Sequence, residues 1–380
     1  MKNKEFNTFN VAILSFSHFI HDIYTSIFPP LLPLIIEKLS LSLGQAGMLS
    51  TVLQLPSVLN PFMGVFVDRK RLERWLIVLA PTMTAVPMSF IGVANSFYML
   101  LILLFVAGTS VALYHVPAPV VVAQEAGNKK GRGMSFYMAG GETARALGPI
   151  VAIGLLSVLT LETFYPVSLL AIITSIVLFF TLPPIEKREK PASKITIMSV
   201  VKEIKHVFYP VSGILIARSF MHSAMGIFLP VYITNQTGNI YLAGAGLALY
   251  ETFGIAGVFL SGTLSDLMGR RKVLFWTLLI APAALVLFIY TSGITQIVML
   301  CISGFTIIAV TPVMLAIIQE NAKGNPSSAN GLFMMVAFFS RAVAILIVGF
   351  LGDIMGLQYM YVICAIIGLA AFPFLIKLKQ

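Results

Sequence analysis

Three side chains that can carry a proton lie close together near the start of the chain. His18, His21 and Asp22 belong to the stretch SFSHFIHDIYTSIFPPLLP (residues 15–33), inside an apolar segment long enough to cross a bilayer. A spacing of four places His18 and Asp22 one turn apart on one helical face. Ionisable groups at membrane depth usually face a bundle interior or a polar cavity, and an acid beside an imidazole suits proton-coupled transport. The alternative is a buried pair that only ties helices together.

The overall composition indicates a polytopic helical membrane protein. The chain has 380 residues, of which 58% are hydrophobic and 11% charged, and its mean hydropathy is +0.93. Long unbroken apolar runs argue against a membrane β-barrel. The sequence contains no phosphate-cradling loop with Lys-Ser/Thr, no nucleophile elbow and no zinc-protease motif. We therefore expect a protein that is not an enzyme and needs no cofactor.

Hydropathy predicts twelve membrane spans in two sets of six. The first six are expected near 9–36, 43–67, 75–93, 96–124, 133–158 and 162–182. The second six are expected near 207–234, 241–265, 273–291, 295–320, 328–350 and 357–377. These spans divide the chain into an N-terminal half (1–182), a polar cytoplasmic linker (183–206) with a short surface helix around 195–205, and a C-terminal half (207–380).

The basic residues predict how the chain is oriented. Nearly all of the 25 Lys and Arg fall at the termini, in the linker, or in loops that the twelve-span topology puts on the same side as the termini. The positive-inside rule then predicts cytoplasmic termini and a multi-pass protein of the cell inner membrane. The net charge of +10 is explained by this topology, so no nucleic-acid partner is expected. The expected partners are the lipid bilayer, a small-molecule substrate and protons, and the chain is expected to act as a monomer.

The two halves repeat one another. The repeated features are Gly64-x-x-x-Asp68-Arg69 with Gly262-x-x-x-Asp266-Leu-Met-Gly269-Arg270-Arg271, and Ile27-Phe28-x-Pro30 with Ile227-Phe228-x-Pro230. In this register Arg218 corresponds to His18, and His222 corresponds to Asp22. Two parallel six-helix repeats with a site between them near the midplane are a known transporter plan.

These motifs resemble a known family. The segment from Gly262 to Lys272 resembles the loop signature of the major facilitator superfamily, whereas the first copy lacks the glycine expected before its basic cluster. Three further stretches are similar to the fosmidomycin-resistance branch of efflux carriers: Ser17-His18 to Asp22, Gly108-x-x-x-Ala112-x-x-His115-x-Pro117, and Gly140-Gly141-x-x-x-x-Ala146-Leu147-Gly148-Pro149. The resemblance implies an all-α fold of twelve helices in two pseudo-symmetric halves, and close helix packing at Gly148 and Pro149. It also implies a conformational latch at Gly64, Asp68, Arg69, Gly262, Asp266, Gly269, Arg270 and Arg271.

Few charged side chains lie inside the predicted spans, and their acids and arginines balance. We predict that protons are handled by Asp22, His18, Glu251 and Glu142. We predict that substrate is bound by Arg218, Arg341, Arg145, His222, His115, His21 and Tyr24, because arginines at membrane depth favour an anionic substrate. Two structural alternatives stay open: a Glu142–Arg145 bridge within one helix, and a bridge from Arg341 to Glu251 or Glu142.

The favoured function is secondary active transport by alternating access. We expect proton-coupled antiport that exports a small amphipathic or anionic organic compound, as in drug resistance. One alternative is proton-coupled uptake of an organic anion, which the same arginines would serve. Another is a divalent-metal carrier that uses the membrane His and Asp side chains, although Arg145 and Arg218 would repel a cation. No resident metal is predicted.

Overall fold

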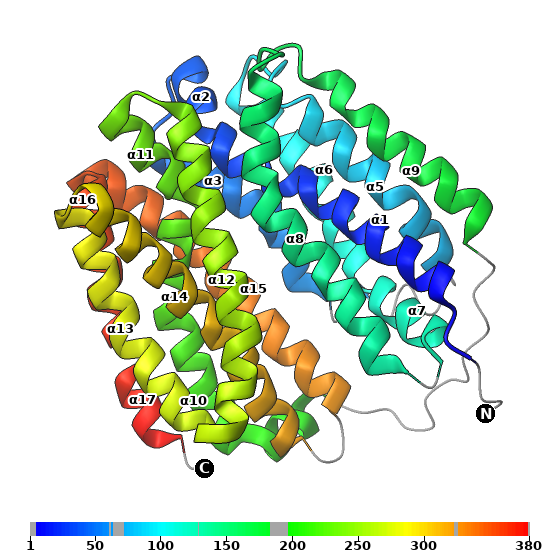
Figure 1. Cartoon of the computed structure of the whole chain (residues 1–380), viewed down its shortest axis with the longest axis vertical. Helices are drawn as coiled ribbons and strands as arrows, with labels where there is room; N and C mark the ends of the chain where they lie inside the picture. The colour runs from blue at the N-terminus through cyan, green and yellow to red at the C-terminus, as the bar shows by residue number, and fades with distance from the viewer. Residues whose placement is uncertain are drawn as a thin grey trace. The chain divides into compact units, whose positions relative to one another are not determined.

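The computed structural model describes residues 5–60, 62–63, 72–127, 129–182, 197–322 and 326–378, and within these ranges it contains helices and no strands. Contacts divide the chain into two compact units. The first unit is Met1–Ser40 with Val52–Glu189, and the second is Leu41–Thr51 with Lys190–Gln380. Figure 1 labels the helices of both units.

The first unit is built around two long helices that pack along one another. Its elements are α1 (Thr8–Ser26), α2 (Phe28–Leu39), the 3₁₀ turn Leu55–Leu59, α5 (Glu73–Ser89), α6 (Phe97–His115), α7 (Ala118–Glu125), α8 (Lys130–Leu156), the 3₁₀ turn Tyr165–Val167 and α9 (Ser168–Thr181). Asn7 and Ser96 accept backbone N–H groups at the first turns of α1 and α6, which is the usual role of polar N-cap side chains.

Glycines let α8 approach α1 closely (Figure 1). A Cβ atom at Gly140 would collide with the carbonyl of Ser15, and one at Gly148 would collide with the side chain of Ser26. A helix surface without side chains can lie against a neighbouring backbone, as small-residue motifs do in membranes. This close contact sets how the polar residues of α1 lie along α8.

The second unit consists of longer helices. Its elements are α10 (Ile197–Ser223), a π-helical turn (Ala224–Phe228), α11 (Leu229–Thr237), α12 (Ile240–Met268), α13 (Arg270–Tyr290), α14 (Gly293–Asn321), α15 (Pro326–Met355), α16 (Leu357–Leu369) and α17 (Phe372–Lys377). Helix α10 begins inside the stretch 183–206 that the sequence suggested as a linker. A short surface helix was expected around 195–205. From residue 197 onward, where the structure describes this stretch, it forms the first turns of α10 and is not a separate helix.

The two repeats change helical geometry at the same motif. Helix α1 ends at Ser26 and α2 begins at Phe28, two residues before Pro30. Helix α10 gives way to the π-helical turn Ala224–Phe228, which ends two residues before Pro230. A proline inside a helix has no N–H to donate and its ring crowds the preceding turn, which favours a break or a widened turn there.

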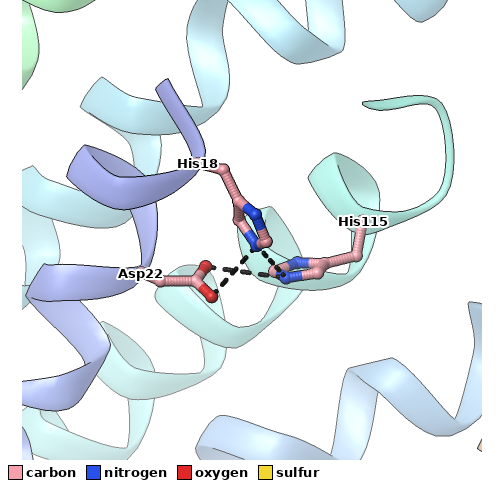
Figure 2. Close-up of side chains that lie close together, drawn as sticks. All are labelled: His18, Asp22 and His115. Atoms are coloured by element: carbon pink, nitrogen blue, oxygen red, sulfur yellow. Dashed lines mark hydrogen bonds and ion pairs between the residues drawn. The ribbon is translucent and has the colours of Figure 1, made fainter. Parts of the chain in front are cut away.

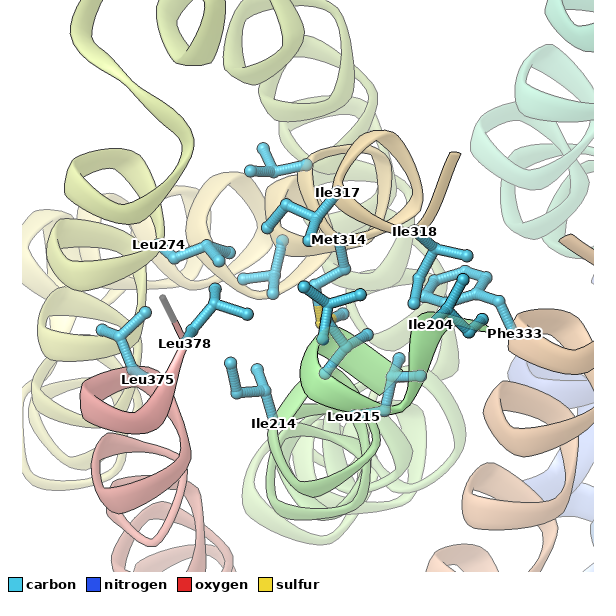
Figure 3. Packing of buried hydrophobic residues seen from close by; sticks show 14 of the residues in the cluster. Ile204, Ile214, Leu215, Leu274, Met314, Ile317, Ile318, Phe333, Leu375 and Leu378 are labelled. Carbon is cyan, nitrogen blue, oxygen red and sulfur yellow. The ribbon is translucent and has the colours of Figure 1, made fainter. Parts of the chain in front are cut away.

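A large apolar core holds α10 in the second unit (Figure 3). Its members are buried and come from five helices and the residue that ends the last of them: Ile204, Ile214 and Leu215 of α10, Leu274 of α13, Met314, Ile317 and Ile318 of α14, Phe333 of α15, Leu375 of α17, and Leu378. The α10 members recur at helical spacing, so one face of α10 is anchored.

The segment Leu41–Thr51 packs with the second unit although it comes early in the sequence. The Asp353 carboxylate accepts the N–H groups of Leu43 (2.6 Å) and Gly44 (2.7 Å) at the start of α3 (Leu43–Gln54). Farther along, the Thr51 hydroxyl donates to the Ala342 carbonyl at 3.0 Å. A carboxylate from α15 therefore satisfies N–H groups that the first turn of α3 leaves without helical partners.

Eight helices in the described part of the chain are long and apolar enough to cross a bilayer, and Tyr165–Thr181 is a shorter apolar helix. The protein is thus a multi-pass membrane protein. The number twelve stays a prediction, because part of the predicted second span lies outside the described residues.

Candidate functional site

The principal polar cluster of the first unit joins α1 to the end of α6 (Figure 2). His18 Nε2 lies 3.2 Å from Asp22 Oδ2, and His115 Nε2 lies 3.5 Å from Asp22 Oδ1. The two Nε2 atoms lie 3.3 Å from each other. The one-turn spacing of His18 and Asp22 on α1 is confirmed, and the structure adds His115 from α6.

Backbone carbonyls set the orientation of both imidazoles. The Nδ1 atom of His18 lies 2.8 Å from the Tyr137 carbonyl, and that of His115 lies 2.9 Å from the Val111 carbonyl. A carbonyl oxygen can only accept, so both Nδ1 atoms carry a hydrogen. The His18 ring also stacks on Tyr137 with 4.0 Å between centroids. In a neutral imidazole with Nδ1–H, the Nε2 atom presents a lone pair, and here both lone pairs point into the cluster.

The cluster therefore brings three acceptors together. Two neutral Nε2 atoms and a carboxylate have no hydrogen among them, and lone pairs at these distances repel one another. One cation shared by the three groups removes the repulsion. The chemistry that this arrangement can perform is the reversible binding of a proton or another cation.

Exposure differs among the members of the cluster. The side chain of His18 is only 5% exposed, whereas those of Asp22 and His115 are 14% and 29% exposed. His115 is thus the most exposed member of the cluster.

Two predicted substrate residues on α1 are buried instead. His21 is completely buried against Tyr114, and neither of its ring nitrogens has a hydrogen-bond partner among the described atoms. Tyr24 is 1% exposed and donates its hydroxyl to the Val167 carbonyl at 2.7 Å. In this conformation both side chains belong to the packing of the first unit, so their contact with substrate stays a prediction.

Helix α8 closes the cluster on one side through Gly141. A Cβ atom there would lie 2.5 Å from His18 Cε1, 2.8 Å from His18 Nε2 and 3.1 Å from Asp22 Oδ2. Only glycine leaves room for these groups without displacement. The sequence showed Gly140-Gly141 as part of a motif, but it gave no sign that Gly141 covers the polar cluster.

Glu142 and Arg145, which follow Gly141 on α8, form an ion pair within the helix. This is the structural alternative that their spacing of three suggested. Arg145 is 43% exposed and Glu142 13% exposed at their side chains. Their predicted roles in substrate binding and proton handling stay predictions.

The second unit carries a basic cluster at the corresponding place in the repeat. Arg218 is 6% exposed, and its Nη1 donates to the Ile307 carbonyl (2.8 Å) and to Nδ1 of His222 (3.0 Å). Arg341 and His222 both lie close to Gly226. A Cβ atom added to Gly226 would lie 3.5 Å from Nη2 of Arg341 and 3.7 Å from Cδ2 of His222. Glu251 lies half-buried on α12 of this unit.

The latch residues are described only in the second copy, because Gly64, Asp68 and Arg69 lie outside the described residues. Arg270 Nη2 lies 2.6 Å from Asp266 Oδ1 and 2.7 Å from Glu320 Oε1. Gly269 joins α12 to α13 with φ of +93°, a conformation that favours glycine. Apart from its own helix backbone and chain neighbours, nothing in the described residues lies within 4 Å of a Cβ placed on Gly262. Arg271 reaches the Ile376 carbonyl at 3.5 Å.

Comparison with known proteins agrees with the helical, multi-pass architecture. The sequence profile of the Major Facilitator Superfamily matches residues 14–325 and 211–380. The chain therefore belongs to the Major Facilitator Superfamily. Its members are secondary transporters and not enzymes, and they carry small molecules across membranes, typically as monomers.

Individual relatives cover nearly the whole chain. The chain is 26% identical over 369 residues to the Fosmidomycin resistance protein of Escherichia coli (strain K12), with 94% of this chain and 90% of that protein covered. Among solved structures, it is similar to the nucleoside transporter NupG (TM-score 0.79, 15% identity, 100% of both chains covered). It is also similar to a bacterial homologue of the human lysosomal transporter Spinster (TM-score 0.77, 15% identity, 98% and 94% covered). The structural likenesses concern the fold alone.

Proposed function

We propose that this secondary transporter is a proton-coupled antiporter that exports a small anionic organic compound. The proton is bound by His18, Asp22 and His115 in the first unit. The anion is bound by Arg218, with Arg341 and His222, in the second unit. The observation that carries the proposal is the convergence of two fixed Nε2 atoms and a carboxylate within 3.5 Å.

One proton changes the charge of the first cluster by a single unit. With both imidazoles neutral the cluster carries the −1 charge of Asp22, and with one proton shared among the three acceptors it is neutral. Charge at membrane depth is costly, so protonation alters the free energy of burying this site. A conformational change that exposes the site to alternate sides of the membrane then transports the proton.

The basic cluster supports an anionic cargo. Arg218 is almost completely buried, and its Nε is a buried donor without a hydrogen-bond partner among the described atoms. A guanidinium recognises carboxylates and phosphates through paired hydrogen bonds. Export is favoured over uptake by the relative whose name refers to fosmidomycin resistance.

The test is transport by purified protein in proteoliposomes with an imposed pH gradient. A panel of organic carboxylates, phosphonates and cationic drugs supplies the substrates. We expect anions to move against the direction of proton flow, and a protonophore to abolish the effect. Movement with the proton would establish symport instead, and transport that is indifferent to the pH gradient would refute coupling.

We also propose that both termini are cytoplasmic and that the protein lies in the cell inner membrane, because the basic residues gather on one predicted side. Cysteines introduced at 236 and 198 test this orientation: the first must react with an impermeant label from outside and the second only from inside. The reverse pattern would refute it.

We further propose that the signature around Asp266 and Arg270 latches one conformation of the transport cycle. Asp266→Asn removes one of the two carboxylates that hold Arg270. It is expected to slow transport more than it lowers expression. Parental transport by this variant in proteoliposomes would exclude the latch.

A further inference from the structure

We propose that His18, Asp22 and His115 also bind one divalent cation of the zinc class. The ligands are Nε2 of each histidine and a carboxylate oxygen of Asp22, with a fourth position left for water or an anion. This inference goes beyond proton coupling, and it concerns binding by the protein whether or not transport is driven by protons.

The spacing of the three donor groups matches a tetrahedral site. Zn–N and Zn–O bonds of about 2.0–2.2 Å place tetrahedral ligands about 3.3 Å apart. In this cluster the two Nε2 atoms lie 3.3 Å apart, Oδ2 of Asp22 lies 3.2 Å from His18 and Oδ1 of Asp22 lies 3.5 Å from His115. One donor atom from each of the three residues can be chosen so that all three lie within 4.8 Å of one another, and a small rotation of the carboxylate brings one oxygen toward both imidazoles. One carboxylate and two histidines facing a common point are also a ligand set that suits zinc and similar metals.

The surroundings of the histidines favour metal binding as well. A histidine that ligates a metal commonly donates its other ring N–H to a carboxylate or backbone carbonyl, which fixes the tautomer and orients the ring. His18 and His115 both do this, through the carbonyls of Tyr137 and Val111. Both rings are thus held with Nε2 available as a ligand, so binding requires little rearrangement.

Charge and access permit a cation at this position. Asp22 supplies one negative charge directly. The nearby positive charge of Arg145 is offset by its ion pair with Glu142 on the same helix. Asp22 and His115 are partly exposed, and Gly141 lies close against His18 and Asp22.

The experiment is a titration of purified, tag-free protein with Zn²⁺ followed by calorimetry, and with Co²⁺ followed by the absorption of a tetrahedral complex. We expect one ion per chain. Asp22→Asn and His115→Gln each remove a ligand and should weaken binding by at least about 100-fold, beyond the 10–100-fold that loss of an outer partner costs. His206→Gln is the matched control, because His206 is a surface histidine bonded to Asn321 at 3.0 Å.

Thermal unfolding distinguishes lost ligands from lost folding. Without metal, each variant must unfold cooperatively, and only the parent and His206→Gln should gain thermal stability when Zn²⁺ is added. Because Asp22→Asn and His115→Gln alter different helices, one well-folded variant suffices. Absence of binding, or equal binding by the parent and the ligand variants, would overturn the proposal. Metal binding without pH-driven transport would refute only the proposed coupling, and the converse result would refute only the metal site.

Discussion

The Nε2 atoms of His18 and His115 lie 3.3 Å apart although 97 positions separate the two residues in the chain. Each imidazole is oriented by a backbone carbonyl from behind, and Asp22 lies beside both. Two helices of the first unit therefore contribute side chains to one polar cluster. It is the basis of the predictions about the first unit.

Replacing His115 tests whether the third acceptor is needed. His115→Gln keeps a polar side chain on α6 but removes the Nε2 lone pair that faces Asp22 and His18. We expect substrate accumulation driven by a pH gradient to fall at least about tenfold, which corresponds to ~1.4 kcal/mol. The same flux assay on His206→Gln should give the parental value. Unchanged gradient-driven accumulation in His115→Gln would show that His18 and Asp22 suffice.

Gly141 and Gly154 lie on the same helix and offer a matched pair. The Cβ of Gly141→Ala would press on His18 and Asp22. A Cβ on Gly154 would meet nothing within 4 Å in the described part of the chain apart from its own helix backbone and chain neighbours. Overpacking costs about 1–3 kcal/mol, so Gly141→Ala should lower thermal stability and impair transport. Gly154→Ala should be neutral or stabilising by about 0.5–1 kcal/mol, because alanine favours a helix interior. Similar behaviour of both variants would contradict the close approach of α8 to the cluster.

Arg218 offers a test of anion recognition. Arg218→Lys keeps the positive charge but loses the planar group that donates to the Ile307 carbonyl and to His222. We expect substrate affinity to fall about tenfold or more, measured by equilibrium binding to detergent-solubilised protein. Arg341→Lys should act in the same direction. If both variants bind substrate as the parent does, the arginines are structural.

Asp353 is expected to stabilise the start of α3. Asp353→Ala removes the acceptor for the N–H groups of Leu43 and Gly44 and should cost about 1 kcal/mol, as loss of a helix N-cap usually does. Asp353→Asn keeps one side-chain oxygen and should cost less. Thermal unfolding of the three proteins under one condition provides the comparison. Equal stability of the alanine variant and the parent would mean that solvent replaces the carboxylate without loss.

The sequence allowed good predictions of features that depend on local spacing. It did not allow prediction of contacts between residues far apart in the chain. The four-residue interval of His18 and Asp22 determines that they share a helical face. The two Ile-Phe-x-Pro motifs indicated a repeat, and the structure shows a change of helical geometry at each of them. By contrast, nothing in one sequence states which turn of α6 meets α1, so the position of His115 had to come from the structure. The contact between Asp353 and α3 was missed for the same reason, since it joins segments from opposite ends of the chain.

Two transport measurements on the Asp22→Asn variant test the central claim most directly: substrate accumulation driven by a pH gradient, and substrate exchange (counterflow) without a gradient. Asparagine imitates the protonated carboxyl, so the variant should bind substrate and exchange it across the membrane at a rate near that of the parent. Without a site that gains and loses a proton, it should not accumulate substrate when a pH gradient is imposed. Both assays are run on the same vesicles, and counterflow serves as the control for folding and insertion. We predict retained counterflow with abolished gradient-driven accumulation; gradient-driven accumulation equal to that of the parent would contradict the assignment of the proton to His18, Asp22 and His115.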